Sequence, residues 1–137
     1  MTVHLKKLSV GTQSLDKLRL RQTLRLEETG KLIHITRNRP RRAVEILDGG
    51  SIYWIIKGVI IARQEITDLV EVRRVDGRPA CGLVLCPELI PTTPKRVRIF
   101  QGWRYLELED TPADLSDVAE EDMPPALAAE LRALGIL

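Results

Sequence analysis

The chain has 137 residues, 44% of them hydrophobic and 29% charged, so it can bury one core and is too apolar to stay disordered. No apolar run approaches the roughly 18–20 residues that cross a bilayer. Residues 1–11 also lack the apolar centre of a secretory signal, so we expect no membrane segment and a cytoplasmic location.

The formal net charge of +2 is the sum of two unequal parts. Residues 1–104 carry 20 Lys and Arg against 10 Asp and Glu, a sum of +10. Residues 105–137 carry one Arg against nine acids, a sum of −8. This asymmetry predicts RNA or another polyanion as partner, or a tail that masks the basic body; the alternative is a solvated surface with a solubilising tail.

The first half of the chain alternates strand and helix signals. Ser14 is a good N-cap and Gly30 a good C-terminal stop for a helix, although the leucines between them also fit a strand in part. Pro40 suits a helix start, and Asp48-Gly49-Gly50 ends that helix. The predicted order is strand 3–10, helix 14–28, strand 32–36 and helix 40–47.

From residue 51 onward the pattern is that of a β-meander. Lys57-Gly58 and Asp76-Gly77 read as hairpin turns, and Pro87, Pro91 and Pro94 mark a loop because proline cannot donate in a sheet. The predicted strands are 51–57, 59–72, 80–86, 97–100 and 103–108. Together the elements predict an α+β fold: a small, mostly antiparallel, partly open β-barrel with flanking helices.

The predicted barrel occupies residues 1–108. Residues 109–137 form an acidic linker and a last helix, 126–134, which we expect to dock on the same domain through Leu127, Leu131 and Leu134.

An arginine cluster follows the second predicted strand. Its members are Arg37, Arg39, Arg41 and Arg42. Guanidinium groups around a helix start suit phosphate or carboxylate, and they are unfavourable there unless an anion arrives. The alternative is solvated arginines, some of them paired with Glu45 or Asp48.

Strand 51–57 offers a second candidate surface. Alternation places Ser51, Tyr53 and Lys57 on one face, which predicts the wall of a site, and Trp54 on the other face in the core. The alternative for Tyr53 is a half-buried side chain with its hydroxyl bonded.

Two further polar groups lie in strand-rich segments. Arg63 and Gln64 are polar residues inside an apolar strand, where a charge is costly unless it is paired. We expect them to contact a ligand; the alternative is a structural ion pair of Arg63 with Glu65. Around Gln101, Trp103 and Arg104, cations alternate with aromatic rings, a pattern typical of single-stranded nucleic acid binding. The alternative is that Phe100 and Trp103 close the end of the core.

No catalytic motif, metal site or cofactor is predicted. Cys81 and Cys86 read as reduced, buried thiols, and the two histidines lack metal-ligand spacing. Thr36, Lys57 and Glu65 could act as an acid–base group only if the fold joins them.

Three runs carry a resemblance to a known family: His34 to Arg42, Leu47 to Gly58, and Phe100 to Leu106. With Arg63-Gln64 they resemble an uncharacterised alphaproteobacterial family of short cytoplasmic proteins, to about residue 115. A weaker resemblance, in Gly49-Gly50 and the following strand, is to PUA-like and ASCH-like domains, small barrels that often bind RNA or modified nucleobases. It implies a PUA-like fold by analogy and assigns no site residue.

Three functions follow as expectations. The first is an RNA-binding module with a basic, aromatic-lined surface. The second is a small hydrolase of a nucleobase-like amide, and the third is a protein-interaction module with an acidic tail. The sequence does not indicate an oligomeric state.

Overall fold

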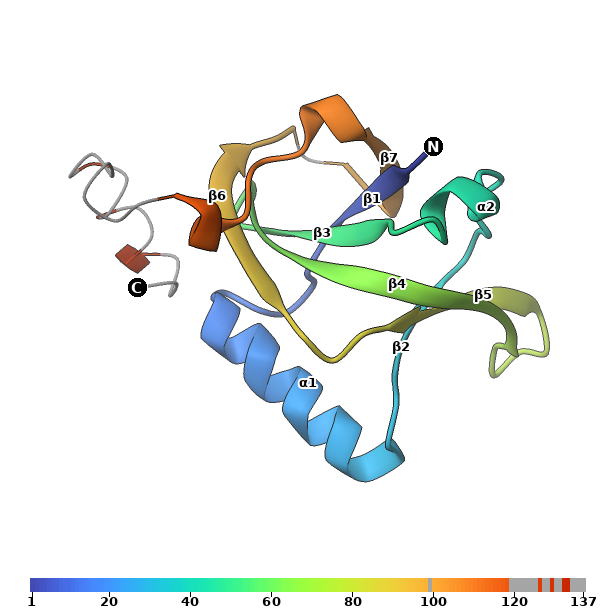
Figure 1. Ribbon diagram of the computed structural model, residues 1–137. Helices are drawn as coiled ribbons and strands as arrows, with labels where there is room; N and C mark the ends of the chain where they lie inside the picture. The colour runs from blue at the N-terminus through green and yellow to red at the C-terminus, as the bar shows by residue number, and fades with distance from the viewer. Residues whose placement is uncertain (99, 119–125, 127–128, 130–131, 134–137) are drawn as a thin grey trace.

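The computed structural model describes residues 1–98, 100–118, 126, 129, 132 and 133, and its described part is an α+β fold built on one curled sheet (Figure 1). The elements are β1 (Val3–Leu8), α1 (Leu15–Thr29), β2 (Leu32–Thr36), α2 (Ala43–Ile46), β3 (Ser51–Ile56), β4 (Val59–Arg73), β5 (Pro79–Leu85), β6 (Ile90–Arg96) and β7 (Trp103–Glu107), followed by the 3-10 turns η1 (Leu108–Asp110) and η2 (Leu115–Asp117).

The sheet is open rather than closed. Its strand order is β2-β5-β4-β3-β1-β7, with β6 beside β4, so that β2 and β7 form the two ends of the path. Neighbouring strands run antiparallel except β1 and β3, which are parallel with Leu5 opposite Ile52. The expected mostly antiparallel sheet is confirmed, and α1 lies beneath it in Figure 1.

Helix α1 forms where its caps predict it. The Ser14 side chain accepts a hydrogen bond from the Lys17 N–H at 3.2 Å, and the Gly30 N–H donates to the Leu26 carbonyl at 2.8 Å. Gly30 has φ 75°, the left-handed conformation that ends many helices. Leu15 and Leu18 are buried and fix the helix on the sheet.

Alternation along β3 divides the apolar side chains into two clusters. Trp54 is 3% exposed and belongs to the main core with Val3 and Leu5 of β1, as predicted. Tyr53 belongs to a smaller cluster on the opposite face, packed against Phe100. The β3–β4 turn is the predicted one, with φ 54° at Lys57 and 77° at Gly58.

Three predictions about individual elements are wrong. The expected proline loop contains β6, which pairs with β4 in the sheet and holds Pro91 and Pro94. Proline is tolerated at a sheet edge, where its missing N–H interrupts no ladder. Residues 97, 98 and 100 form no strand, and α2 is shorter than predicted.

The described part of the acidic segment is docked. Thr92 of β6 forms an isolated β-bridge with Asp114, and the Thr93 N–H donates to the Ala113 carbonyl at 2.9 Å, so residues 113–117 lie against β6 (Figure 1). The predicted apolar face of the last helix, Leu127, Leu131 and Leu134, lies outside the described residues. None of the helices in the described ranges is long and apolar enough to cross a membrane.

Candidate functional site

Two segments far apart in sequence meet at one place in the fold. The loop after β2 and the start of β7 are joined by a hydrogen bond from the Trp103 indole N–H to the Asn38 carbonyl, 3.1 Å long. A second bond, also 3.1 Å, runs from the Arg42 backbone N–H to the Tyr105 hydroxyl. Because β2 and β7 lie at opposite ends of the strand order, these side chains bridge the two ends of the curled sheet.

An open groove of about 790 Å³ lies where these segments meet. Its lining includes Trp103 and Tyr105, whose rings meet edge to face at 5.0 Å. Among the described residues, the lining contains no Asp or Glu and five cationic residues: Lys7, Arg37, Arg39, Arg41 and Arg104.

The three arginines of the loop face solvent. Arg37, Arg39 and Arg41 are exposed, and none of them has a carboxylate within ion-pair distance among the described residues. Their positive charge is therefore uncompensated at this rim of the groove, which favours an anion there.

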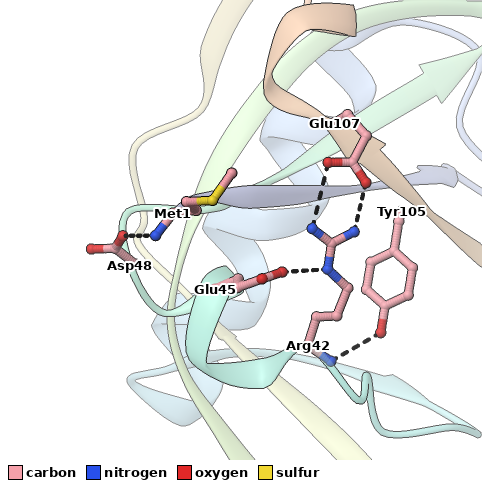
Figure 2. A network of polar contacts seen from close by, with 6 residues as sticks. All are labelled: Met1, Arg42, Glu45, Asp48, Tyr105 and Glu107. Carbon is pink, nitrogen blue, oxygen red and sulfur yellow. Dashed lines mark hydrogen bonds and ion pairs between the residues drawn. The ribbon is translucent and has the colours of Figure 1, made fainter.

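Arg42, the fourth member of the predicted cluster, has a different position (Figure 2). Its guanidinium pairs with Glu45 and donates to Glu107 at 2.6 Å, and it lies 5.3 Å from the centre of the Tyr105 ring. These hydrogen bonds raise the pKa of Arg42 and lower that of Glu107. Arg42 is thus an anchor of the loop, and the predicted pairing with Glu45 is found.

Arg104 and Gln101 shape the turn before β7. The Arg104 guanidinium donates to the Gln101 and Trp103 carbonyls, both at 3.0 Å, and lies 5.3 Å from the centre of the Phe100 ring. Trp103 is half-buried and packs against the main core, so its predicted role as a core side chain is met in part while its ring still lines the groove.

Ser51, Tyr53 and Arg63 lie on the outer face of the sheet, away from the groove lining. Arg63 donates to Asp114 at 2.7 and 2.8 Å and to the Ser51 hydroxyl at 3.1 Å. The expected ion pair of Arg63 with Glu65 is wrong, because the partner is Asp114. The Arg63–Asp114 pair raises the pKa of Arg63, lowers that of Asp114, and fixes residues 108–118 on the sheet.

Gln64 is fully buried, and its amide is satisfied within the protein. Its Oε1 accepts from the Trp54 indole N–H at 3.1 Å and from Gln22 at 2.9 Å, while its Nε2 donates to Gln22 and to the Cys86 carbonyl, both at 2.9 Å. Gln64 therefore has a structural role, and its ligand contact stays a prediction.

The possible acid–base group is not assembled. Lys57 lies in the β3–β4 turn, whereas Glu65 is opposite Ser51 at the other end of the same hairpin, and Thr36 is in β2. Lys57 is exposed in the turn, whereas Ser51 and Tyr53 are buried, and none of the three lines the groove. The shared binding surface of these residues stays a prediction.

Sequence reasoning missed Lys7 and His34. Lys7 is on the core face of β1 with Val3 and Leu5, opposite Trp54 on one side and Trp103 on the other. Burial lowers its pKa. The signal available in the sequence was a charged residue on the apolar face of a strand.

His34 lines a second, smaller pocket of about 210 Å³ that also includes Lys7 and Trp54. It is on the core face of β2 with Leu32, where an imidazole is as unexpected as a lysine. Its pKa is lowered to about 4 by burial first and by Lys7 and Arg25 second, so the ring is neutral at pH 7.

The sulfur and carboxylate groups form no metal centre in the part of the chain that the structure describes. No three His, Cys, Asp or Glu side chains gather there in a metal-binding arrangement. Cys81 and Cys86 are both free thiols, and Cys81 is buried.

Comparison with known proteins gives a family and no relative of known activity. No curated protein and no solved structure matches the chain. A family model described as "Protein of unknown function (DUF1489)" matches residues 5–137, nearly the whole sequence. The expected membership of an uncharacterised family is confirmed, and the chain belongs to the DUF1489 family.

Proposed function

We propose that this protein binds single-stranded nucleic acid, specifically RNA, along the groove between the loop after β2 and the start of β7. The observation that carries the proposal is that two basic segments meet at one groove, whose described lining has five cationic residues and no acidic one. The proposal includes a PUA-like arrangement of the curled sheet and a cytoplasmic location.

The placement of the cations supports a phosphate chain better than one small anion. Arg37, Arg39 and Arg41 are spaced along an exposed loop, and Lys7 lies on the sheet on the groove's inner side. A single small anion would be held by charges that converge on one buried point. Charges spread along an open groove suit the repeated phosphates of a nucleic acid backbone.

Trp103 supports a single strand rather than a duplex. Its N–H is used by Asn38, which fixes the ring in place, and the ring is half-buried at the groove. A fixed ring beside a row of cations is the arrangement on which unpaired bases stack while the cations follow the backbone. In a duplex the bases already stack on each other and cannot use this ring.

The salt dependence of binding tests the phosphate contacts. Arg39→Ala with Arg41→Ala should flatten the slope of log K against log salt for a 12-nucleotide single-stranded RNA by about 1.4, because each lost phosphate contact removes roughly 0.7. Filter-binding titrations at several salt concentrations measure the slope.

Lys31→Ala with Lys57→Ala is the matched control, because it removes two exposed lysines that lie outside the groove lining. Its slope should equal that of the wild type. Equal slopes for both double variants would contradict the groove as the binding surface. A wild-type protein that binds no RNA at low salt would refute the proposed function itself.

Substitutions of Trp103 distinguish base stacking from the electrostatic contacts with phosphate. Trp103→Leu should weaken RNA binding by about 1–3 kcal/mol with the salt slope unchanged, whereas Trp103→Phe should keep part of the affinity because it retains a ring. Both variants lose the bond to Asn38, so their comparison isolates the ring. A melting curve for each variant confirms folding, and equal affinities for the two would exclude stacking on this residue.

A further inference from the structure

The smaller pocket continues the groove along β2. Residues 32–34 line the pocket and residues 35–37 line the groove, and Lys7 belongs to both linings. In the sheet register Lys7 is opposite Trp54, which lines the pocket, and opposite Trp103, which lines the groove. A strand held in the groove therefore passes the pocket at Lys7.

The pocket has apolar walls and basic residues around them. Leu18, Leu32, Leu85 and Trp54 supply buried apolar surface. Arg21 and Arg25 of α1, both exposed, join Lys7 in the lining. Such a site suits a flat apolar ring whose attached phosphate remains at the basic edge.

His34, a residue of the pocket wall, has a hydrogen-bonding atom without a partner. Its Nε2 is buried and has no partner among the described residues, while its ring is edge to face with Trp54, with 5.2 Å between the ring centres. Buried polar atoms are nearly always paired in native proteins, so an unpaired one in a pocket indicates a missing partner. The neutral imidazole can donate or accept one hydrogen bond, as the edge of a nucleobase requires.

The size of the pocket and its apolar walls favour a base over a phosphate. A volume of about 210 Å³ is below the roughly 300 Å³ at which pockets for drug-sized ligands begin, so a single ring system fits better than a larger group. The exposed Arg21 and Arg25 can contact a phosphate at the edge of the pocket, whereas the leucines and the neutral imidazole of its walls give a phosphate little compensation for lost hydration.

We propose that the pocket beneath α1 holds one unstacked base of the bound RNA, with the His34 Nε2 as its hydrogen-bonding partner. This inference rests on the proposed function. It assigns a contact with a base to His34, whereas the arginine loop contacts the phosphate backbone of the RNA.

The test compares two substitutions at His34. His34→Leu removes the hydrogen bond and should lower affinity for the 12-nucleotide RNA about 2- to 10-fold, with the salt slope unchanged because no phosphate contact is lost. His34→Gln keeps an amide that can donate or accept and should retain most of the affinity.

Free nucleosides give a second measurement that needs no variant. Adenosine, cytidine, guanosine and uridine carry no phosphate, and at least one of them should shift the indole N–H resonance of Trp54 in a ¹H–¹⁵N spectrum of the wild type. The Trp103 indole, which lies in the groove, is the internal comparison.

The outcomes distinguish failure of the base pocket from failure of the proposed function. RNA binding with a normal salt slope, equal affinity for His34→Leu and wild type, and no Trp54 shift would overturn the base pocket and leave the proposed function standing. If His34→Leu does not melt cooperatively, the nucleoside titration decides alone. A wild type that binds no RNA at low salt refutes both.

Discussion

Arginines that look equivalent in the sequence differ in the structure by the carboxylates within their reach. Arg42 has Glu45 and Glu107, and Arg63 has Asp114, so both are structural. Arg39 and Arg41 have no such partner among the described residues and remain available to a ligand. Glu107 and Asp114 are distant in the sequence from the arginines they pair with, so the local pattern could not separate Arg42 from the other members of its cluster or identify the partner of Arg63.

Gln64 is predicted to matter for stability and not for binding. Gln64→Leu leaves the buried Trp54 indole N–H without its acceptor and the Cys86 carbonyl without its donor, which should destabilise the fold by about 1–3 kcal/mol. Urea unfolding measures the loss. Gln22→Ala is the control and should cost less, because Gln64 keeps its other two partners. A stable Gln64→Leu variant with weakened RNA binding would instead make Gln64 a ligand contact.

His34 should make stability depend on pH. Its folded pKa of about 4 lies below the unfolded 6.5, so between these values the unfolded chain takes up a proton that the folded protein does not. Its contribution is complete above pH 6.5 and is lost as the pH falls towards 4, by on the order of 2–3 kcal/mol. Lys7 and Arg25 strengthen this effect by repelling the charged ring.

The measurement is urea unfolding of wild type and His34→Gln at pH 7.5 and pH 4.5. From pH 7.5 to pH 4.5 the free energy of unfolding should fall more for the wild type than for His34→Gln. His4, whose pKa is lowered by burial and then by Arg63, contributes in the same direction, so a His4→Gln variant is measured alongside. Equal losses in wild type and His34→Gln would show that the ring is protonated in the folded state as readily as in the unfolded one.

At the scale of elements, the sequence was sufficient wherever local chemistry decides. Ser14 and Gly30 bound α1, and Lys57-Gly58 formed the expected turn, because caps and turns depend on a few neighbouring residues. Strand β6 was not predicted, because its pairing with β4 is a long-range property and its prolines argue locally for a loop.

The Arg63–Asp114 ion pair helps to hold the docked segment 108–118 on the sheet. Asp114→Asn removes the carboxylate that holds Arg63, whose side chain is only 25% exposed, and should destabilise the protein by about 1–3 kcal/mol. The amide of Thr93, which donates to Ala113, should exchange its hydrogen faster. Arg63 lowers the pKa of Asp114. The contribution of this ion pair to folding stability is therefore complete above the usual pKa of an Asp side chain and is lost as the pH falls through the lowered pKa of Asp114.

Asp117→Asn is the matched control for this pair. It makes the same change of charge in the same segment, and the Asp117 side chain has no ion pair or hydrogen bond among the described residues. Equal stability of the two variants would mean that the Arg63–Asp114 pair does not hold the segment.

At the scale of the molecule, the candidate site is a product of topology. The sequence indicated the arginine loop and the Trp103 turn as separate clusters, and the hypothesis that both contact one ligand needed a fold in which they meet. The curled sheet supplies it, since β2 and β7 come together through Trp103 and Tyr105 although they lie at opposite ends of the strand order. Lys7 and His34 were missed because the sequence does not show which strands pair, and therefore does not show which side chains of two strands lie next to each other on one face of the sheet.

The charge division between body and tail leads to the last prediction, that the acidic end competes with RNA for the basic groove. Residues 119–137 carry four Asp and Glu and one Arg, a sum of −3. Truncation should follow Val118 rather than Leu108, because Asp114 anchors the segment between them to Arg63. The truncated protein should bind RNA more tightly at low salt, and the difference should vanish near 1 M salt, where the Debye length is about 3 Å. The full-length variant Glu120→Gln, Glu121→Gln, Asp122→Asn should show the same gain without any change of length. A truncated protein that melts cooperatively and binds RNA no more tightly than the wild type at low salt would show that the tail does not mask the groove.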